Sequence, residues 1–189
     1  EYDEARGVAT DLSGNVYVVG GTKGKLAGAS NSGRTDVFLI KYNSSGTKQW
    51  TKSLGSNEND LANGVTTDSS GNFYVTGFTY KYLDGNTSAG SSDLLVVKYN
   101  SSGKKQWTQQ LGSSSRDHAR GVATDSSGNV YVTGDTYGGV DGNTNAGYND
   151  LFVVKYNSSG TKQWTKQLGT AEYDEARGVA TDLSGNVYV

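Results

Sequence analysis

The 189-residue sequence contains no proline, cysteine or methionine, and its single histidine is His118. Without cysteine there is no disulfide framework, no thiolate zinc site and no cysteine nucleophile, and one histidine excludes a multi-histidine metal site. Seventeen Lys and Arg residues against 19 Asp and Glu residues give a net charge of −2, which argues against a phosphate-neutralising nucleic-acid binder. No apolar run approaches the roughly 20 residues of a membrane helix. We therefore expect neither a nucleic-acid nor a membrane partner.

The abundant residues point to short strands and tight turns. The sequence holds 27 Gly and 13 Tyr residues, together with many Asn, Ser and Val residues. It begins at Glu1 without methionine and shows no signal-peptide pattern. This start suggests a processed N-terminus or an excised or engineered segment.

An internal repeat organises the whole chain. The phrase Gly-Val-Ala-Thr-Asp begins at Gly7, and its variants recur at intervals of 57 residues. The tryptophans keep the same interval, at Trp50, Trp107 and Trp164. The period divides the chain into residues 1–57, 58–114 and 115–171, followed by a shorter segment, residues 172–189.

The final segment, residues 172–189, is identical to residues 1–18 at all 18 positions. The first segment matches residues 58–75 at only 12 positions and residues 115–132 at 14. Three explanations fit this pattern: an engineered overlap, a segment cut from a longer array with a 171-residue repeat, or a boundary chosen for a periodic assembly.

Each period contains four strand signals, which in the first repeat are residues 5–11, 15–20, 36–42 and 47–54. Turn sequences rich in Asp, Asn and Gly separate them. The third strand carries the continuous apolar run from Val37 to Ile40, which implies that both of its faces are covered. Four antiparallel strands buried on both faces describe a β-propeller blade. A β-solenoid, the alternative, has shorter coils without four turn-bounded strands.

Three segments of the third repeat resemble the bacterial and archaeal SBBP, or seven-bladed β-propeller, repeat family. They are residues 121–134 (GVATDSSGNVYVTG), residues 150–160 (DLFVVKYNSSG) and residues 163–169 (QWTKQLG). The first two strands are also similar to the NHL repeat. The resemblance implies a propeller, usually within a large secreted or cell-surface protein, and no defined catalytic activity.

The sequence thus predicts an all-β chain of three blades, plus a two-strand partial blade at residues 172–189. Propellers close with about 4–8 blades, so we expect closure by oligomerisation. The terminal segment of one copy completes a blade of another by strand addition or swapping. A dimeric ring is the favoured homo-oligomer, and a filament is the alternative.

One loop places oxygen ligands at alternate positions, as calcium loops do. Its candidates are Asp141, Asn143 and Asn145, with Asp84 and Asn86 in the preceding repeat. The twelfth position is Phe152 rather than glutamate. The alternative is a hydrogen-bonded loop between the second and third strands. No other cofactor is expected.

The remaining polar residues favour structural roles. The tryptophans recur once per blade, which favours packing between blades or at the outer edge over sugar-stacking platforms. The turn aspartate Asp11 and its counterparts repeat too regularly to form one catalytic site. His118 follows Asp117, but adjacent strand residues face opposite sides, so the pair does not make a triad. We expect no catalytic residue.

The predicted function is therefore that of a non-enzymatic propeller scaffold that self-assembles. We expect the chain to be engineered or excised from a larger secreted or surface protein. The alternative is a module that binds a carbohydrate or a protein surface partner through its loops.

Overall fold

The computed structural model describes residues 2–189, and nearly all of its regular structure is β-strand. Two single-turn 3₁₀ helices, η1 (Leu26–Gly28) and η2 (Val140–Gly142), lie in the long loops. Neither helix is long and apolar enough to span a membrane. The strands are β1 (Asp3–Thr10), β2 (Val16–Thr22), β3 (Asp36–Tyr42), β4 (Lys48–Leu54), β5 (Asp60–Thr67), β6 (Phe73–Thr79), β7 (Asp93–Tyr99), β8 (Lys105–Leu111), β9 (Asp117–Thr124), β10 (Val130–Thr136), β11 (Asp150–Tyr156), β12 (Lys162–Leu168), β13 (Ala180–Thr181) and β14 (Val187–Tyr188).

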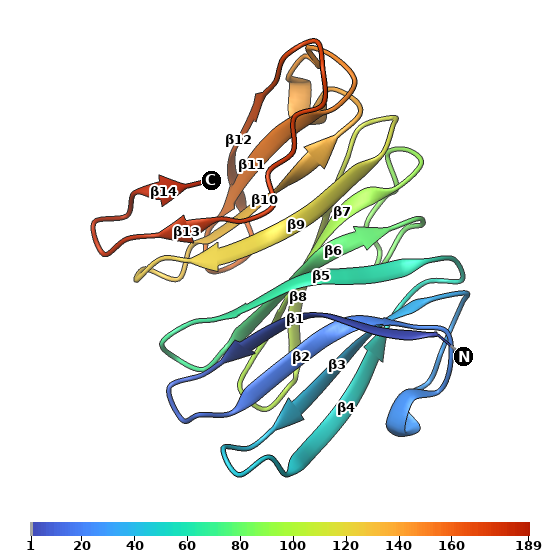
Figure 1. Cartoon of the computed structure of the whole chain (residues 1–189), viewed down its shortest axis with the longest axis vertical. Coiled ribbons are helices and arrows are strands. Elements are labelled where there is room, and N and C mark those ends of the chain that lie inside the picture. Colours follow the sequence, from blue (N-terminus) through green and yellow to red (C-terminus); the bar gives the residue numbers. More distant parts are fainter. Residues whose placement is uncertain (1) are drawn as a thin grey trace.

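The strands form three four-stranded antiparallel sheets, β1–β4, β5–β8 and β9–β12, each in chain order, and the pair β13–β14. We call the three sheets blades 1, 2 and 3. They stack as a fan in which the innermost strands β1, β5 and β9 follow one another (Figure 1). The strand pair β13–β14 comes next in this fan, beyond β9 (Figure 1). This arrangement confirms the predicted all-β propeller blades.

The strand limits agree with the sequence prediction at β3 and extend beyond it in the first two strands. β1 begins at Asp3 rather than at residue 5, and β2 continues to Thr22, because these two residues still pair. The pairing of β1 with β2 also brings the carbonyl oxygen of Glu4 to 1.9 Å from the place where a Cβ would stand at Gly20. Only glycine allows the two strands to approach so closely.

The apolar residues gather between blades rather than within one sheet. One core joins Tyr17 and Leu39 of blade 1 to Phe73 of blade 2. The second joins Tyr74 of blade 2 to Phe152 of blade 3. These side chains are at most 1% exposed, so the central strands are covered on both faces as the apolar runs predict.

The turn after each innermost strand is organised by its aspartate. Oδ1 of Asp11 accepts the backbone N–H groups of Ser13 and Asn15 at 3.0 and 2.9 Å, and Oδ2 accepts the Tyr17 hydroxyl at 3.0 Å. Gly14 supplies the positive φ of +74° that the turn needs. The same bonds recur at Asp68, Asp125 and Asp182. The predicted turn role of these aspartates is confirmed.

Candidate functional site

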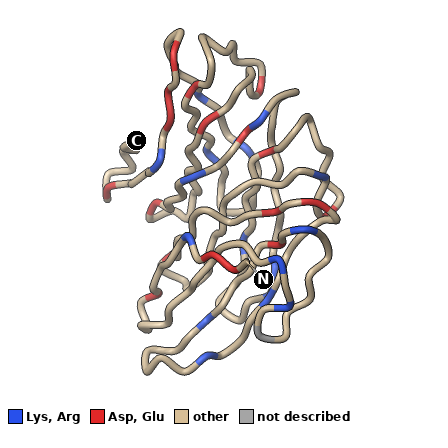
Figure 2. Tube along the Cα trace, turned by 45° about the vertical axis from the view of Figure 1, so that its right-hand side comes forward, with Lys and Arg blue, Asp and Glu red and all other residues tan. Residues whose placement is uncertain are grey.

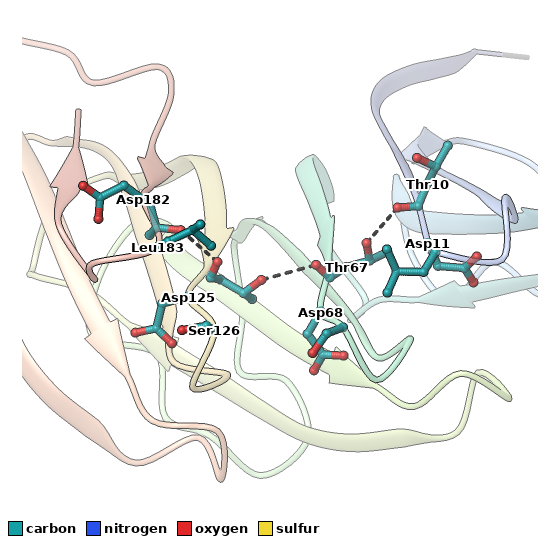
Figure 3. Close-up of a pocket in the computed structure, with 12 residues that line it drawn as sticks. Thr10, Asp11, Thr67, Asp68, Asp125, Ser126, Asp182 and Leu183 are labelled. Atoms are coloured by element: carbon teal, nitrogen blue, oxygen red, sulfur yellow. Dashed lines mark hydrogen bonds between the residues drawn. The ribbon is translucent and has the colours of Figure 1, made fainter.

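A ladder of threonine hydroxyls joins the inner strands of successive blades at the C-terminal ends of these strands (Figure 3). Thr67 donates to the carbonyl oxygen of Thr10 at 2.8 Å, and Thr124 donates to that of Thr67 at 3.3 Å. Thr181 continues the ladder to Thr124 at 2.9 Å. Each rung links residues 57 positions apart, so the ladder connects each blade to the next.

This ladder borders a hollow of about 630 Å³. The hollow is lined by four copies of the same turn, among them Leu12 and Leu183. The carboxylates of the lining aspartates point away from the ladder (Figure 3) and are held in their own turns. The hollow therefore offers hydroxyls, backbone carbonyls and exposed leucines.

Charged residues of both signs are interspersed along the blades (Figure 2).

The tryptophans contact the next blade. Trp50 packs against Gly103, where a Cβ would stand 3.0 Å from the indole, and Trp107 packs in the same way against Gly160 at 2.9 Å. Trp107 also donates from Nε1 to the carbonyl oxygen of Ser158 at 3.3 Å. The prediction of packing between blades is confirmed for these two residues.

The structure does not gather the calcium candidates around one point. Asp84 pairs with Lys105 and Asp141 with Lys162. Burial opposes ionisation of Asp141, but the hydrogen bonds from Lys162 and Thr165 and the charge of Lys162 together outweigh it and lower the pKa of that carboxyl.

The side chains of the candidate asparagines form hydrogen bonds with backbone groups. Nδ2 of Asn86 donates to the carbonyl oxygen of Leu83 at 2.9 Å. Nδ2 of Asn143 donates to Val140 at 2.8 Å in the same way, and Oδ1 of Asn145 accepts the N–H of Gly147 at 2.8 Å. Among residues 2–189, no three acidic or histidine side chains form a metal-binding group.

His118 is 7% exposed and stacks on Phe78 with ring centroids 4.0 Å apart. Its Nε2 lies 3.0 Å from Oγ of Ser92. Burial, with the charges of nearby arginines, lowers the pKa of His118 to about 4. Asp117 is engaged separately, because it accepts the backbone N–H of Ser113 at 2.6 Å. His118 and Asp117 thus contact different groups, and neither contact joins the two side chains.

One polar cluster breaks the repeat, and sequence reasoning missed it. Asp135 is 1% exposed and pairs with Arg120, which also lies 3.6 Å from Glu175. The positions equivalent to Asp135 in the first two repeats hold Gly21 and Phe78. The sequence carried one signal of this cluster, which is an aspartate at a position where the other repeats have glycine or phenylalanine.

Residues 172–189 lie against blade 3 as the start of a further blade. The backbone N–H of Asp174 donates to the carbonyl oxygen of Asn149 at 3.0 Å. The complete junction between blades 1 and 2 has the same bond, from Asp60 to Thr35 at 2.7 Å. The terminal segment thus repeats the contact made between whole blades.

A fan of four-stranded antiparallel blades with apolar cores between them defines a β-propeller. The SBBP family model, described as a β-propeller repeat, matches more than half of the chain, at residues 1–26, 49–80, 106–140 and 163–189. The chain belongs to this family, and the predicted resemblance is confirmed.

Two curated relatives are similar to the chain. The regulatory protein FlaEY of Caulobacter vibrioides is 27% identical over 197 residues, covering 93% of this chain and 20% of the relative. An uncharacterized WD repeat-containing protein of Acanthamoeba polyphaga mimivirus is 26% identical over 179 residues, covering 74% of this chain and 13% of the relative. The chain spans a fifth or less of each.

Proposed function

We propose that this chain is a non-enzymatic propeller scaffold that self-associates by bringing blade 3 of one copy against blade 1 of a second copy. The observation that carries the proposal is the position of residues 172–189 on blade 3. Because their sequence is that of residues 1–18, each of their contacts with blade 3 is available to blade 1 of another copy.

The contacts concerned are backbone and polar ones. Asp174 donates its N–H to Asn149, and Thr181 donates its hydroxyl to the carbonyl oxygen of Thr124 at 2.9 Å. Glu175 lies 3.6 Å from Arg120. The counterparts of the three terminal residues in blade 1 are residues 3, 10 and 4, which are the same amino acids. Blade 1 of a second copy therefore carries the same side chains for the contact with blade 3 that residues 172–189 carry.

Blade 1 and the terminal segment both leave surface that a second copy can cover. Val8 of blade 1 is 67% exposed, whereas its equivalents Val65 and Val122 are half-buried against neighbouring blades. Within residues 2–189, the pair β13–β14 has no third strand beside it, whereas β2 is paired with β3 along its length. Contact between two copies would cover the exposed apolar surface around Val8 and the open strand edge of the pair β13–β14.

Two routes lead to this junction. Blade 1 of the second copy displaces residues 172–189, or residues 172–189 replace residues 1–18 beside β3 of the second copy. Both routes leave three blades per copy. We propose a closed dimeric ring of six blades, within the range of about 4–8 in known propellers.

Light scattering after size-exclusion chromatography tests the proposal over a range of concentrations. We expect twice the 20.0 kDa mass of one chain. A stable monomer at every concentration would sink the proposal. Two deletions separate the routes, one lacking residues 1–18 and one lacking residues 172–189. Assembly by displacement survives loss of residues 172–189, whereas assembly by strand replacement survives loss of residues 1–18.

A binding role is the second candidate, and one feature favours it. Tyr148 and Tyr173 are 59% and 63% exposed, and their rings stack with centroids 4.9 Å apart. Exposed aromatic faces suit a sugar ring or a protein surface partner. A glycan array with the wild type and a Tyr148→Ala variant tests this role, since specific binding must fall in the variant.

A further inference from the structure

Two positions that meet at each junction between blades hold different side chains at each of the three junctions. The first position lies near the end of the second strand of a blade. The second lies in the first strand of the following blade, or at the equivalent place in residues 172–189. We call the two residues the junction pair. In chain order the junction pairs are Gly21 with Leu61, Phe78 with His118, and Asp135 with Glu175.

The junction pair between blades 1 and 2 is matched in size. A Cβ placed on Gly21 would lie 2.9 Å from Cδ1 of Leu61 and 3.2 Å from Cγ2 of Thr35. The leucine side chain therefore lies in the space that a larger residue at position 21 would need. Phenylalanine or aspartate at this position would have to displace it.

The junction pair between blades 2 and 3 is matched by aromatic stacking. The rings of Phe78 and His118 lie 4.0 Å apart between centroids, with 19° between their planes. Nε2 of His118 also lies 3.0 Å from Oγ of Ser92. Glycine or aspartate in place of Phe78 would leave the buried imidazole without its stacking partner.

The junction pair between blade 3 and residues 172–189 is joined by a cation. Asp135 is 1% exposed and pairs with Arg120 of the adjacent strand β9, and Arg120 lies 3.6 Å from Glu175. A guanidinium carries five N–H donors, so it can contact both carboxylates. Leucine in place of Glu175 would remove the negative charge that the terminal segment brings to Arg120.

We propose that the junction pair determines which strand each blade accepts, and that Asp135 with Arg120 makes blade 3 select a strand that carries glutamate. Residues 1–18 and 172–189 carry this glutamate, as Glu4 and Glu175, whereas β5 and β9 carry Leu61 and His118 there. Similar blades in one chain can pair in the wrong order, and mismatched pairs oppose this by a collision, a lost stacking partner or an unpaired charge.

The partner that fits blade 3 is therefore the N-terminal strand of a second copy, a conclusion that rests on the proposed self-association. The junction pair adds to that proposal a reason why this strand is accepted and the strands of the other blades are not.

Paired substitutions in the full chain test the selection. The mismatched variant carries Glu4→Leu and Glu175→Leu, and the matched variant adds Asp135→Gly, which transfers the first junction pair to blade 3. Light scattering over a dilution series gives the dimer dissociation constant. We expect the mismatched variant to dimerise about tenfold more weakly and the matched variant to recover about threefold or more of this loss, because contacting residues contribute non-additively.

Two further variants complete this test. Asp135→Gly alone should also weaken the dimer, since it pairs glycine with glutamate. Glu58→Leu is the control, because Glu58 lies 3.4 Å from Arg34 but belongs to no junction pair, and its dissociation constant should equal that of the wild type. Circular dichroism should show the same strand content in all variants.

Amide hydrogen exchange in dilute protein gives a second measurement that needs no dimer. The backbone N–H groups of Asp174 and Ala176 donate to blade 3 at 3.0 and 3.4 Å. Both amides should exchange about tenfold faster in Glu175→Leu, and adding Asp135→Gly should slow them again.

The outcomes separate this inference from the proposed self-association. Matched and mismatched variants with equal dissociation constants and equal exchange rates overturn the inference, even where the wild type is a dimer. A wild type that stays monomeric overturns the second copy as the partner. Exchange rates that still follow the junction pair in that monomer support selection by the pair itself.

Discussion

Nε1 of Trp107 donates a hydrogen bond to the carbonyl oxygen of Ser158, which lies 3.3 Å away in the next blade. Beside that carbonyl, the indole packs against the Cα of Gly160, in the turn between β11 and β12. One turn of each following blade thus covers the tryptophan of the blade before it. The stacking of blades depends on this contact as well as on the apolar cores.

Gly160→Ala should destabilise the protein more than Gly46→Ala. Both glycines occupy the same turn with positive φ, +86° and +80°, so both substitutions carry a backbone cost of about 1 kcal/mol. A Cβ at Gly160 would also lie 2.9 Å from Trp107, whereas nothing lies within 4 Å at Gly46. We expect an additional loss of about 1 kcal/mol from this overpacking, measured by urea unfolding. Equal losses would contradict the contact.

Thr67→Val should lower the free energy of unfolding by about 1 kcal/mol, because it removes the hydroxyl bond to Thr10 without changing side-chain volume much. Thr87→Val is the control, since this threonine is exposed in the loop between β6 and β7 and makes no rung of the ladder. The measurement is chemical denaturation of both variants. A control as unstable as Thr67→Val would show that the rung contributes nothing.

The protein should lose stability between pH 6.5 and about pH 4 through His118. Burial, followed by the charges of Arg116 and Arg120, lowers the folded-state pKa from 6.5 to about 4. A histidine with a lowered folded-state pKa contributes stability above its unfolded value, and that stability is lost as the pH falls. The loss is on the order of 3 kcal/mol.

His118→Leu tests this pH dependence, because leucine occupies the equivalent position in the second blade, at residue 61. The free energy of unfolding of the variant should change much less between pH 6.5 and pH 4 than that of the wild type. Parallel pH profiles would assign the loss of stability to other groups.

Asp125→Ala should destabilise the protein near neutral pH by about 1 kcal/mol. Burial opposes ionisation of this carboxyl, but hydrogen bonds from Asn129, Tyr131 and Ser127 outweigh it and hold its pKa below 3.8. A lowered pKa stabilises the folded state above the unfolded value, and the contribution disappears as the pH falls below it. The difference between variant and wild type in urea unfolding should therefore shrink below pH 3.8. A constant difference would exclude the ionised carboxyl as its source.

The sequence predicted the blade and its turns because these depend on local chemistry. A turn aspartate four residues before an asparagine bonds the backbone wherever it stands, as at Asp11 and Asn15. Alternating and continuous apolar runs identified the strands in the same way. The calcium candidates had the right spacing, but the structure pairs Asp84 and Asp141 with lysines from a neighbouring strand. Spacing along the chain does not reveal such partners.

The sequence by itself determined the 57-residue repeat, the four strands in each unit and the identity of the two terminal segments. The tertiary structure decided which residues from different blades meet, such as Arg120 with Asp135 and Glu175, or Asp36 with Asp60. The reason is physical. Local patterns set hydrogen bonds within a turn or a strand pair, whereas the burial of a charge depends on which blade lies beside it.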